Sequence, residues 1–200
     1  MVLKLNINKL TELIAQLSVD RASQVLSKMV KSGTQIILER SYVANISEVT
    51  EKINAEGGEV MGAFVDLVGD APFKFLFYTD AQQAVVLTDM ILQKKIGTTK
   101  EVNIYVNGAI QEIGNILASA VCNVFSTDFQ INMKPSPPEV FHDFVGSIFE
   151  ECIMSVASER KEIFMIESTF YVVKQNIKCS MLILPMPGSE EILTEICNKI

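Results

Sequence analysis

The feature that most constrains the fold is an order of predicted elements that occurs twice along the 200 residues. Each half reads as a long helix, a short strand, a second helix, a β-hairpin and a closing helix. The first half places these elements at 6–32, 34–46, 47–55, 58–79 and 80–95, and the second half at 101–125, 129–134, 137–158, 162–186 and 189–200. A repeat of this kind decides the architecture, because each unit must bury its apolar faces against the other.

Short similar strings in the two halves support an internal duplication. The string VLTDMI at 86–91 resembles ILTEIC at 192–197, and each string lies in the closing helix of its half. Each half offers only two or three good strands, too few for an independent sheet. We therefore predict one α+β domain over residues 1–200, a pseudo-twofold pair of structural repeats at approximately 1–97 and 98–200. Its sheet is mainly antiparallel, with long helices packed on it.

Charge and hydropathy exclude several partners. Seventeen basic residues face twenty-four acidic ones, for a net charge of −7. Binding to a nucleic-acid backbone or an anionic membrane needs clustered lysine and arginine, so neither partner is expected. No signal peptide and no membrane-spanning stretch is expected, and the four cysteines are too scattered for a secreted disulfide framework. The sequence thus predicts a cytoplasmic protein with reduced, mostly buried thiols.

The composition also excludes common enzyme classes. His142 is the single histidine, expected on the 137–158 helix, so a zinc site or a nucleophile–histidine pair would depend on it. The chain has no glycine-rich nucleotide cradle. We predict neither a metal site nor a cofactor of its own.

The 101–125 helix carries the most information. Projected at about 100° per residue, one stripe is apolar: Val106, Ile110, Ile113, Leu117, Val121 and Val124. The opposite face holds Gly108, Glu112, Asn115 and Ser119. Glu112 and Asn115 are therefore neighbours on a face that the core does not need, where they could hold a cation and orient a water.

Spacing alone makes such a pair ordinary, because Glu-x-x-Asn occurs three times in the chain, at residues 51–54, 112–115 and 195–198. Only the middle pair is followed, after twenty-two residues, by a proline, Pro138. We expect Pro138 to act structurally, opening the following helix.

The string QEIGNILASAVCNVF with the distal PSPP resembles the CheC/CheX/FliY family of chemotaxis proteins, with CheC the best match in size and duplication. The family motif is Asp or Ser, three residues, Glu, two residues, Asn, twenty-two residues and Pro. Glu112, Asn115 and Pro138 match it, whereas Gly108 stands at its first position. In the first half the equivalent positions hold Leu13 and Gln16, or Glu12 and Ala15 in a register shifted by one residue, so that copy of the motif is degenerate in either register.

The resemblance implies a phosphatase for the phospho-aspartate of a CheY-type response-regulator receiver domain. Asn115 would orient the attacking water, and Glu112 would pair with a lysine of the receiver, which also supplies the Mg²⁺. The alternative is a non-catalytic CheC-like scaffold that binds a CheD-type receptor deamidase or a receiver domain.

Overall fold

A single antiparallel sheet organises the computed structural model, which describes residues 2–30, 34–45, 47–48, 50–51, 57–157, 162–172 and 177–198. Its strands are β1 (Thr34–Asn45), β2 (Glu59–Gly69), β3 (Phe73–Asp80), β4 (Met133–Pro135), β5 (Glu139–Phe144), β6 (Glu162–Val172) and β7 (Ile177–Pro185). The helices are α1 (Val2–Val30), α3 (Ala81–Ile91), α4 (Ile104–Asp128), α5 (Val145–Ala157) and α6 (Ser189–Cys197). The predicted α+β class with a mainly antiparallel sheet is confirmed.

The strand order β1-β6-β7-β3-β2-β4 is symmetric about the central β3–β7 pair, with β5 also pairing β2. The hairpins β2–β3 and β6–β7 lie on either side of that centre. Each hairpin is extended by a strand from the other half of the sequence: β1 pairs β6, whereas β4 and β5 pair β2. The two halves therefore exchange strands across one sheet. The boundary between repeats near residue 97 stays a prediction.

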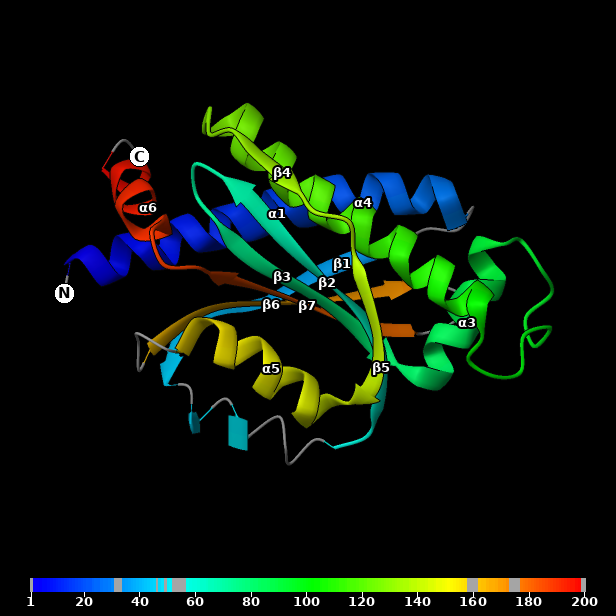
Figure 1. Ribbon diagram of the computed structural model, residues 1–200. Helices are drawn as coiled ribbons and strands as arrows, with labels where there is room; N and C mark the ends of the chain where they lie inside the picture. Colours follow the sequence, from blue (N-terminus) through cyan, green and yellow to red (C-terminus); the bar gives the residue numbers. More distant parts are fainter. Residues whose placement is uncertain are drawn as a thin grey trace.

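Helices cover both faces of the sheet. In Figure 1, α1 and α4 lie side by side over one face, while α5 lies on the other. The larger apolar core fills the space beneath α1 and α4, where the rings of Phe73 and Phe125 lie 5.0 Å apart. A second cluster lies under α5, where Phe149 and Ile153 pack with Leu76 and Leu182. Burial of apolar side chains in both layers holds the sheet between its helices.

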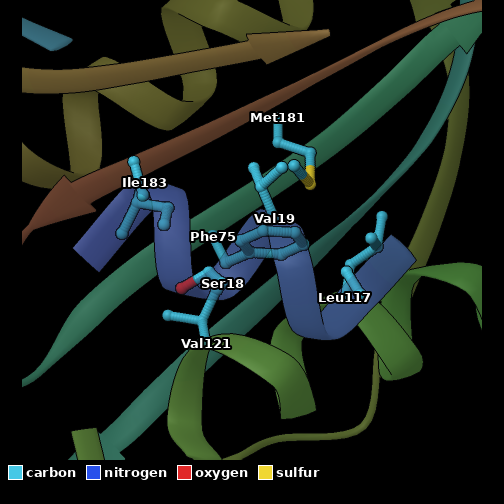
Figure 2. Close-up of a pocket in the computed structure, with 9 residues that line it drawn as sticks. Ser18, Val19, Phe75, Leu117, Val121, Met181 and Ile183 are labelled. Carbon is cyan, nitrogen blue, oxygen red and sulfur yellow. The ribbon is translucent and has the colours of Figure 1, made fainter. Parts of the chain in front are cut away.

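Small residues on α1 face α4. Ala15, Ser18 and Ala22 are buried there, and with Leu117 and Val121 of α4 they line an apolar cavity of about 10 Å³ (Figure 2). A cavity of this size is at the lower limit for a single water, and its apolar lining offers a water too few hydrogen-bond partners. The Ser18 hydroxyl donates to the carbonyl of Ile14 at 2.7 Å, so its polar group is satisfied within the helix. The cavity is a packing gap between α1, α4 and the sheet.

The predicted helix at 137–158 is wrong in its first third. Residues 139–144 form β5, which pairs with β2 from Glu59↔Phe144 to Phe64↔Glu139, and the helix begins only at Val145. The edge of β2 offers unpaired backbone groups, and pairing them outweighs the local helix preference of the segment. The ring of Phe141 then packs 4.8 Å from the ring of Phe64 on β2.

The remaining differences concern short segments. The strand expected at 129–134 is confined to Met133–Pro135. Of the helix expected at 47–55, residues 47–48 and 50–51 are helical, and the others lie outside the described residues. The turn expected near residues 174–176 also lies outside them. Among the described residues, no helix has the length and apolar character needed to cross a membrane.

Candidate functional site

Helix α4 provides a rigid platform for the predicted site. Its first turn is capped by Asn103, whose side-chain oxygen accepts hydrogen bonds from the backbone N–H groups of Tyr105 at 2.9 Å and Val106 at 3.3 Å. The cap satisfies donors that would otherwise lack partners at the helix start. The helix therefore begins at Ile104, whereas the sequence predicted a start at residue 101.

The exposed face of α4 lies where its periodicity predicted. All six residues of the apolar stripe are no more than 2 % exposed, whereas Gly108, Glu112 and Asn115 are exposed and Ser119 is half-buried. Within the described part of the chain, no hydrogen bond or ion pair engages the side chains of Glu112 and Asn115. Both polar groups are therefore available to a partner.

The proline segment between β4 and β5 is fastened to β2 by Ser136. The Ser136 N–H donates to the carbonyl of Asp66 at 2.8 Å, and the Ser136 hydroxyl accepts from the N–H of Asp66 at 3.0 Å. The neighbouring residues Pro135, Pro137 and Pro138 have no N–H to give. Ser136 thus supplies the reciprocal bond that fixes the segment along the sheet.

Gly114 allows this segment to approach the motif helix. A Cβ atom built on Gly114 would lie 3.0 Å from the Cβ of Ala63 on β2 and 3.6 Å from the Cβ of Pro138. The missing side chain therefore lets α4 come close to β2 and leaves Pro138 beside Asn115, the next residue of the helix. The prediction that Pro138 opens a helix is wrong. Pro138 precedes strand β5 and lines the groove.

These elements enclose an open groove of about 420 Å³. One wall is the exposed face of α4, with Gly108, Gln111, Glu112 and Asn115, and the other is the segment Pro135–Pro138. Sequence reasoning missed Gln111 and Ser136 as lining residues; the serine within three prolines was the available signal. Ser119 was expected on the same face, and it is absent from the residues that line this groove in the described structure.

The degenerate positions of the first half lie on the exposed side of α1. Leu13 is 39 % exposed, and Gln16 is exposed and donates from its amide to the Asp20 carboxylate at 3.1 Å. The amide is thus held by its own helix, one turn away. Leu13 provides no charge beside it.

Other groups that could carry chemistry are placed away from this groove. His142 lies on β5, not on a helix, with its Nε2 3.5 Å from a carboxylate oxygen of Glu59. Cys122, Cys152 and Cys179 are buried, and none of the three forms a disulfide within the described part of the chain. Burial raises the pKa of the Cys122 and Cys152 thiols to about 12, so they are poor nucleophiles at neutral pH. Across the described ranges, no group of three or more His, Cys, Asp or Glu side chains could hold a metal ion.

Known proteins resemble this chain both in the sequence of the motif segment and in the fold. Residues 108–142 match the CheC-like family, a segment that runs from the first motif position past Pro138. The whole chain covers 99 % of a FliY chain from Thermotoga maritima at 14 % identity and a TM-score of 0.76. The resemblance to the CheC/CheX/FliY family is thereby confirmed.

Two further structures share the fold. The CheX protein of Desulfovibrio desulfuricans aligns with 86 % of this chain and 98 % of its own, at 17 % identity and a TM-score of 0.56. A chain of the FliG–FliM complex from H. pylori aligns with 94 % of this chain and 96 % of its own, at 11 % identity and a TM-score of 0.65. No curated protein sequence matches the chain. The fold is thus shared by chemotaxis proteins and by flagellar proteins that assemble with others.

Proposed function

We propose that the chain is an aspartyl-phosphate phosphatase acting on a CheY-type receiver domain through Glu112 and Asn115. The observation that carries the proposal is the pairing of an unengaged carboxylate and an unengaged amide, three residues apart on a capped helix, beside the fixed proline segment. Rigid positioning of this kind is what water-orienting catalysis requires.

The chemistry follows from the two side chains. The Asn115 amide does not titrate, but its oxygen can accept a hydrogen bond from a water while its NH₂ group donates to the phosphoryl group. The water oxygen then attacks phosphorus, the bond between phosphorus and the aspartyl oxygen breaks, and the aspartate leaves as a carboxylate. The water proton passes to the phosphate product or to solvent. Such phosphoryl transfer depends on alignment and on stabilisation of charge.

Glu112 serves in docking. Its carboxylate, one helical turn before Asn115, would pair with the lysine of the receiver and set the register in which Asn115 meets the acyl phosphate. The Mg²⁺ belongs to the receiver, as part of the substrate. The open groove fits this scheme, because a protein substrate must approach the helix from outside.

The test is phosphate release from a phosphorylated, Mg²⁺-bound CheY-type receiver domain. The parent protein should accelerate release, and Asn115→Ala should remove the acceleration while leaving binding of the receiver nearly intact. Ser119→Ala, a substitution on the same face outside the groove, serves as the matched control and should retain activity. No acceleration by the parent with several receivers would refute the phosphatase.

The second candidate is a CheC-like scaffold that holds a receiver domain or a CheD-type deamidase. The similarity to FliM chains favours it, as does Gly108, which offers no side chain at the first motif position. A parent protein that binds the receiver without hydrolysis, and in which Asn115→Ala weakens binding, would establish the scaffold instead.

A further inference from the structure

Four large apolar side chains are exposed in the segment just before the motif helix. Leu92, Ile96, Ile104 and Tyr105 are 41 %, 40 %, 79 % and 61 % exposed, and all four lie within fourteen consecutive residues that connect α3 to the first turn of α4. We call these four residues the α3–α4 shelf. Figure 1 shows the connection at the end of the molecule where α3 meets α4. Exposed apolar side chains that are concentrated in one ordered segment offer a surface for a partner, because contiguous apolar surface marks interaction sites.

The shelf is held in place by a buried carboxylate. Asp89 of α3 is fully buried, and its oxygens accept hydrogen bonds from the Thr98 N–H at 2.9 Å, the Thr99 N–H at 3.1 Å and the Thr99 hydroxyl at 2.6 Å. The Lys94 N–H also donates to the Asp89 carbonyl at 2.8 Å. This network orders the loop without turning its apolar residues inward. A docking surface of fixed shape loses less entropy on binding.

The shelf is continuous with the candidate site. Ile104 lies one helical turn before Gly108 and two turns before Glu112, about 12 Å along the axis at 1.5 Å per residue. Tyr105 lies on the same exposed side, seven residues before Glu112. A protein large enough to cover the Glu112–Asn115 groove would reach the shelf.

Charge indicates the occupant. The connection carries three exposed lysines, Lys94, Lys95 and Lys100, against one exposed carboxylate, Glu101, in a chain whose net charge is −7. The Lys94 ammonium lies 4.8 Å from the centre of the Tyr105 ring, which places a positive charge on the apolar surface. A twofold-symmetric contact between two copies of this chain would bring the same lysines against each other. A partner with carboxylates and a phosphoryl group complements them.

We propose that the α3–α4 shelf is the specificity surface that docks the receiver domain beside its phosphorylated site. This inference rests on the proposed function for the identity of the partner. The shelf would bind an apolar patch of the receiver next to its anionic pocket, and Lys94 would add electrostatic attraction at the rim. Glu112 and Asn115 then meet the acyl phosphate in one fixed register.

The experiment measures binding to a CheY-type receiver domain loaded with Mg²⁺ and beryllofluoride, which mimics the acyl phosphate without being hydrolysed. Ile104→Asp should raise the Kd at least tenfold, and Tyr105→Ala and Lys94→Glu should raise it about three- to tenfold. The negative charge of an aspartate in the first turn interacts favourably with the helix dipole, so Ile104→Asp should leave the fold intact. Circular dichroism checks this point.

The matched control is Met154→Asp on α5. Met154 is 76 % exposed and lies on the helix that covers the opposite face of the sheet, so its replacement should leave the Kd unchanged. Kd values for Ile104→Asp, Tyr105→Ala and Lys94→Glu that equal the Kd of the parent would overturn the docking role of the shelf, whether or not the parent hydrolyses phosphate. If these variants bind the receiver more weakly but the parent releases no phosphate, the docking role of the shelf stands and the phosphatase is refuted. Absence of receiver binding by the parent would overturn both.

Discussion

Helices α1 and α4 pack side by side on the same face of the sheet, yet only α4 carries both residues of the proposed site. Both helices bury an apolar stripe against the same core. The exposed side of α4 presents Glu112 and Asn115 beside the proline segment, whereas the corresponding side of α1 presents Leu13 and a Gln16 that bonds to Asp20. The fold therefore depends on the buried stripes. The proposed chemistry would depend on a few exposed residues of α4, whose counterparts α1 lacks while it still packs against the core.

The largest expected effect separates the two helices directly. Glu112→Ala should lower phosphate release from a phosphorylated receiver by about 10²-fold or more, because misalignment of the reacting groups has costs of that order. Leu13→Ala combined with Gln16→Ala should change the rate less than twofold. Initial-rate phosphate assays on the full-length variants provide the measurement. Equal losses on the two helices would contradict the comparison.

A second prediction concerns the close approach of α4 to the sheet. Gly114→Val should lower the free energy of unfolding by about 1–3 kcal/mol, because the new side chain would meet Ala63 and Pro138. It should also reduce phosphatase activity by displacing the proline segment. Urea unfolding checks the stability. The same substitution at Gly108, where a Cβ meets nothing within 4 Å, should not destabilise the protein.

A third prediction concerns the loop that leads into α4, for which Asp89 provides the anchor. Burial works against the charge of this carboxyl, but hydrogen bonds from Thr99, Thr98 and Gly97 outweigh it and hold the pKa below the usual value of 3.8. Its contribution to stability is therefore fully present above about pH 4 and is lost as the pH falls through the lower pKa of the folded state. Asp89→Asn should cost about 1–2 kcal/mol at pH 7, since the amide keeps one acceptor oxygen.

Thermal unfolding of the parent and of Asp89→Asn between pH 7 and pH 3 provides the measurement. The difference between the two proteins should shrink towards the acidic end of the range. A difference that grows on acidification would show that the carboxylate does not hold the loop.

The smallest expected effect is a gain. Gly108→Ser places a hydroxyl at the first position of the motif, where the resembling family has Asp or Ser, and the space there is open. Serine also has a better helix propensity than glycine, by about 0.5 kcal/mol. We expect a rise of about two- to fivefold in kcat/KM and no loss of stability. A fall in kcat/KM would show that the groove needs an open backbone at this position.

Periodicity and turn residues were sufficient to predict both hairpins and the buried face of α4. They wrongly predicted a helix at residues 139–144, because local sequence signals cannot show that the edge of β2 is available for pairing. They also could not predict the reciprocal bond between Ser136 and Asp66, since the two residues are brought together only by the sheet. The motif residues were identified in advance by spacing and resemblance. The groove beside them, and the roles of Gly114 and Gln111, required the folded structure.

The exchanged strands affect how the chain can be made. Thr34 of β1 pairs with Val172 of β6, so a strand formed early in synthesis meets its partner only when most of the chain has been translated. Until then the nascent protein exposes a twelve-residue strand with unpaired backbone groups. Sheets built from such distant pairs fold slowly. We expect yield in the cell to depend on protection of this strand by chaperones, and residues 1–97 expressed alone to aggregate unless residues 98–200 are supplied in the same cell.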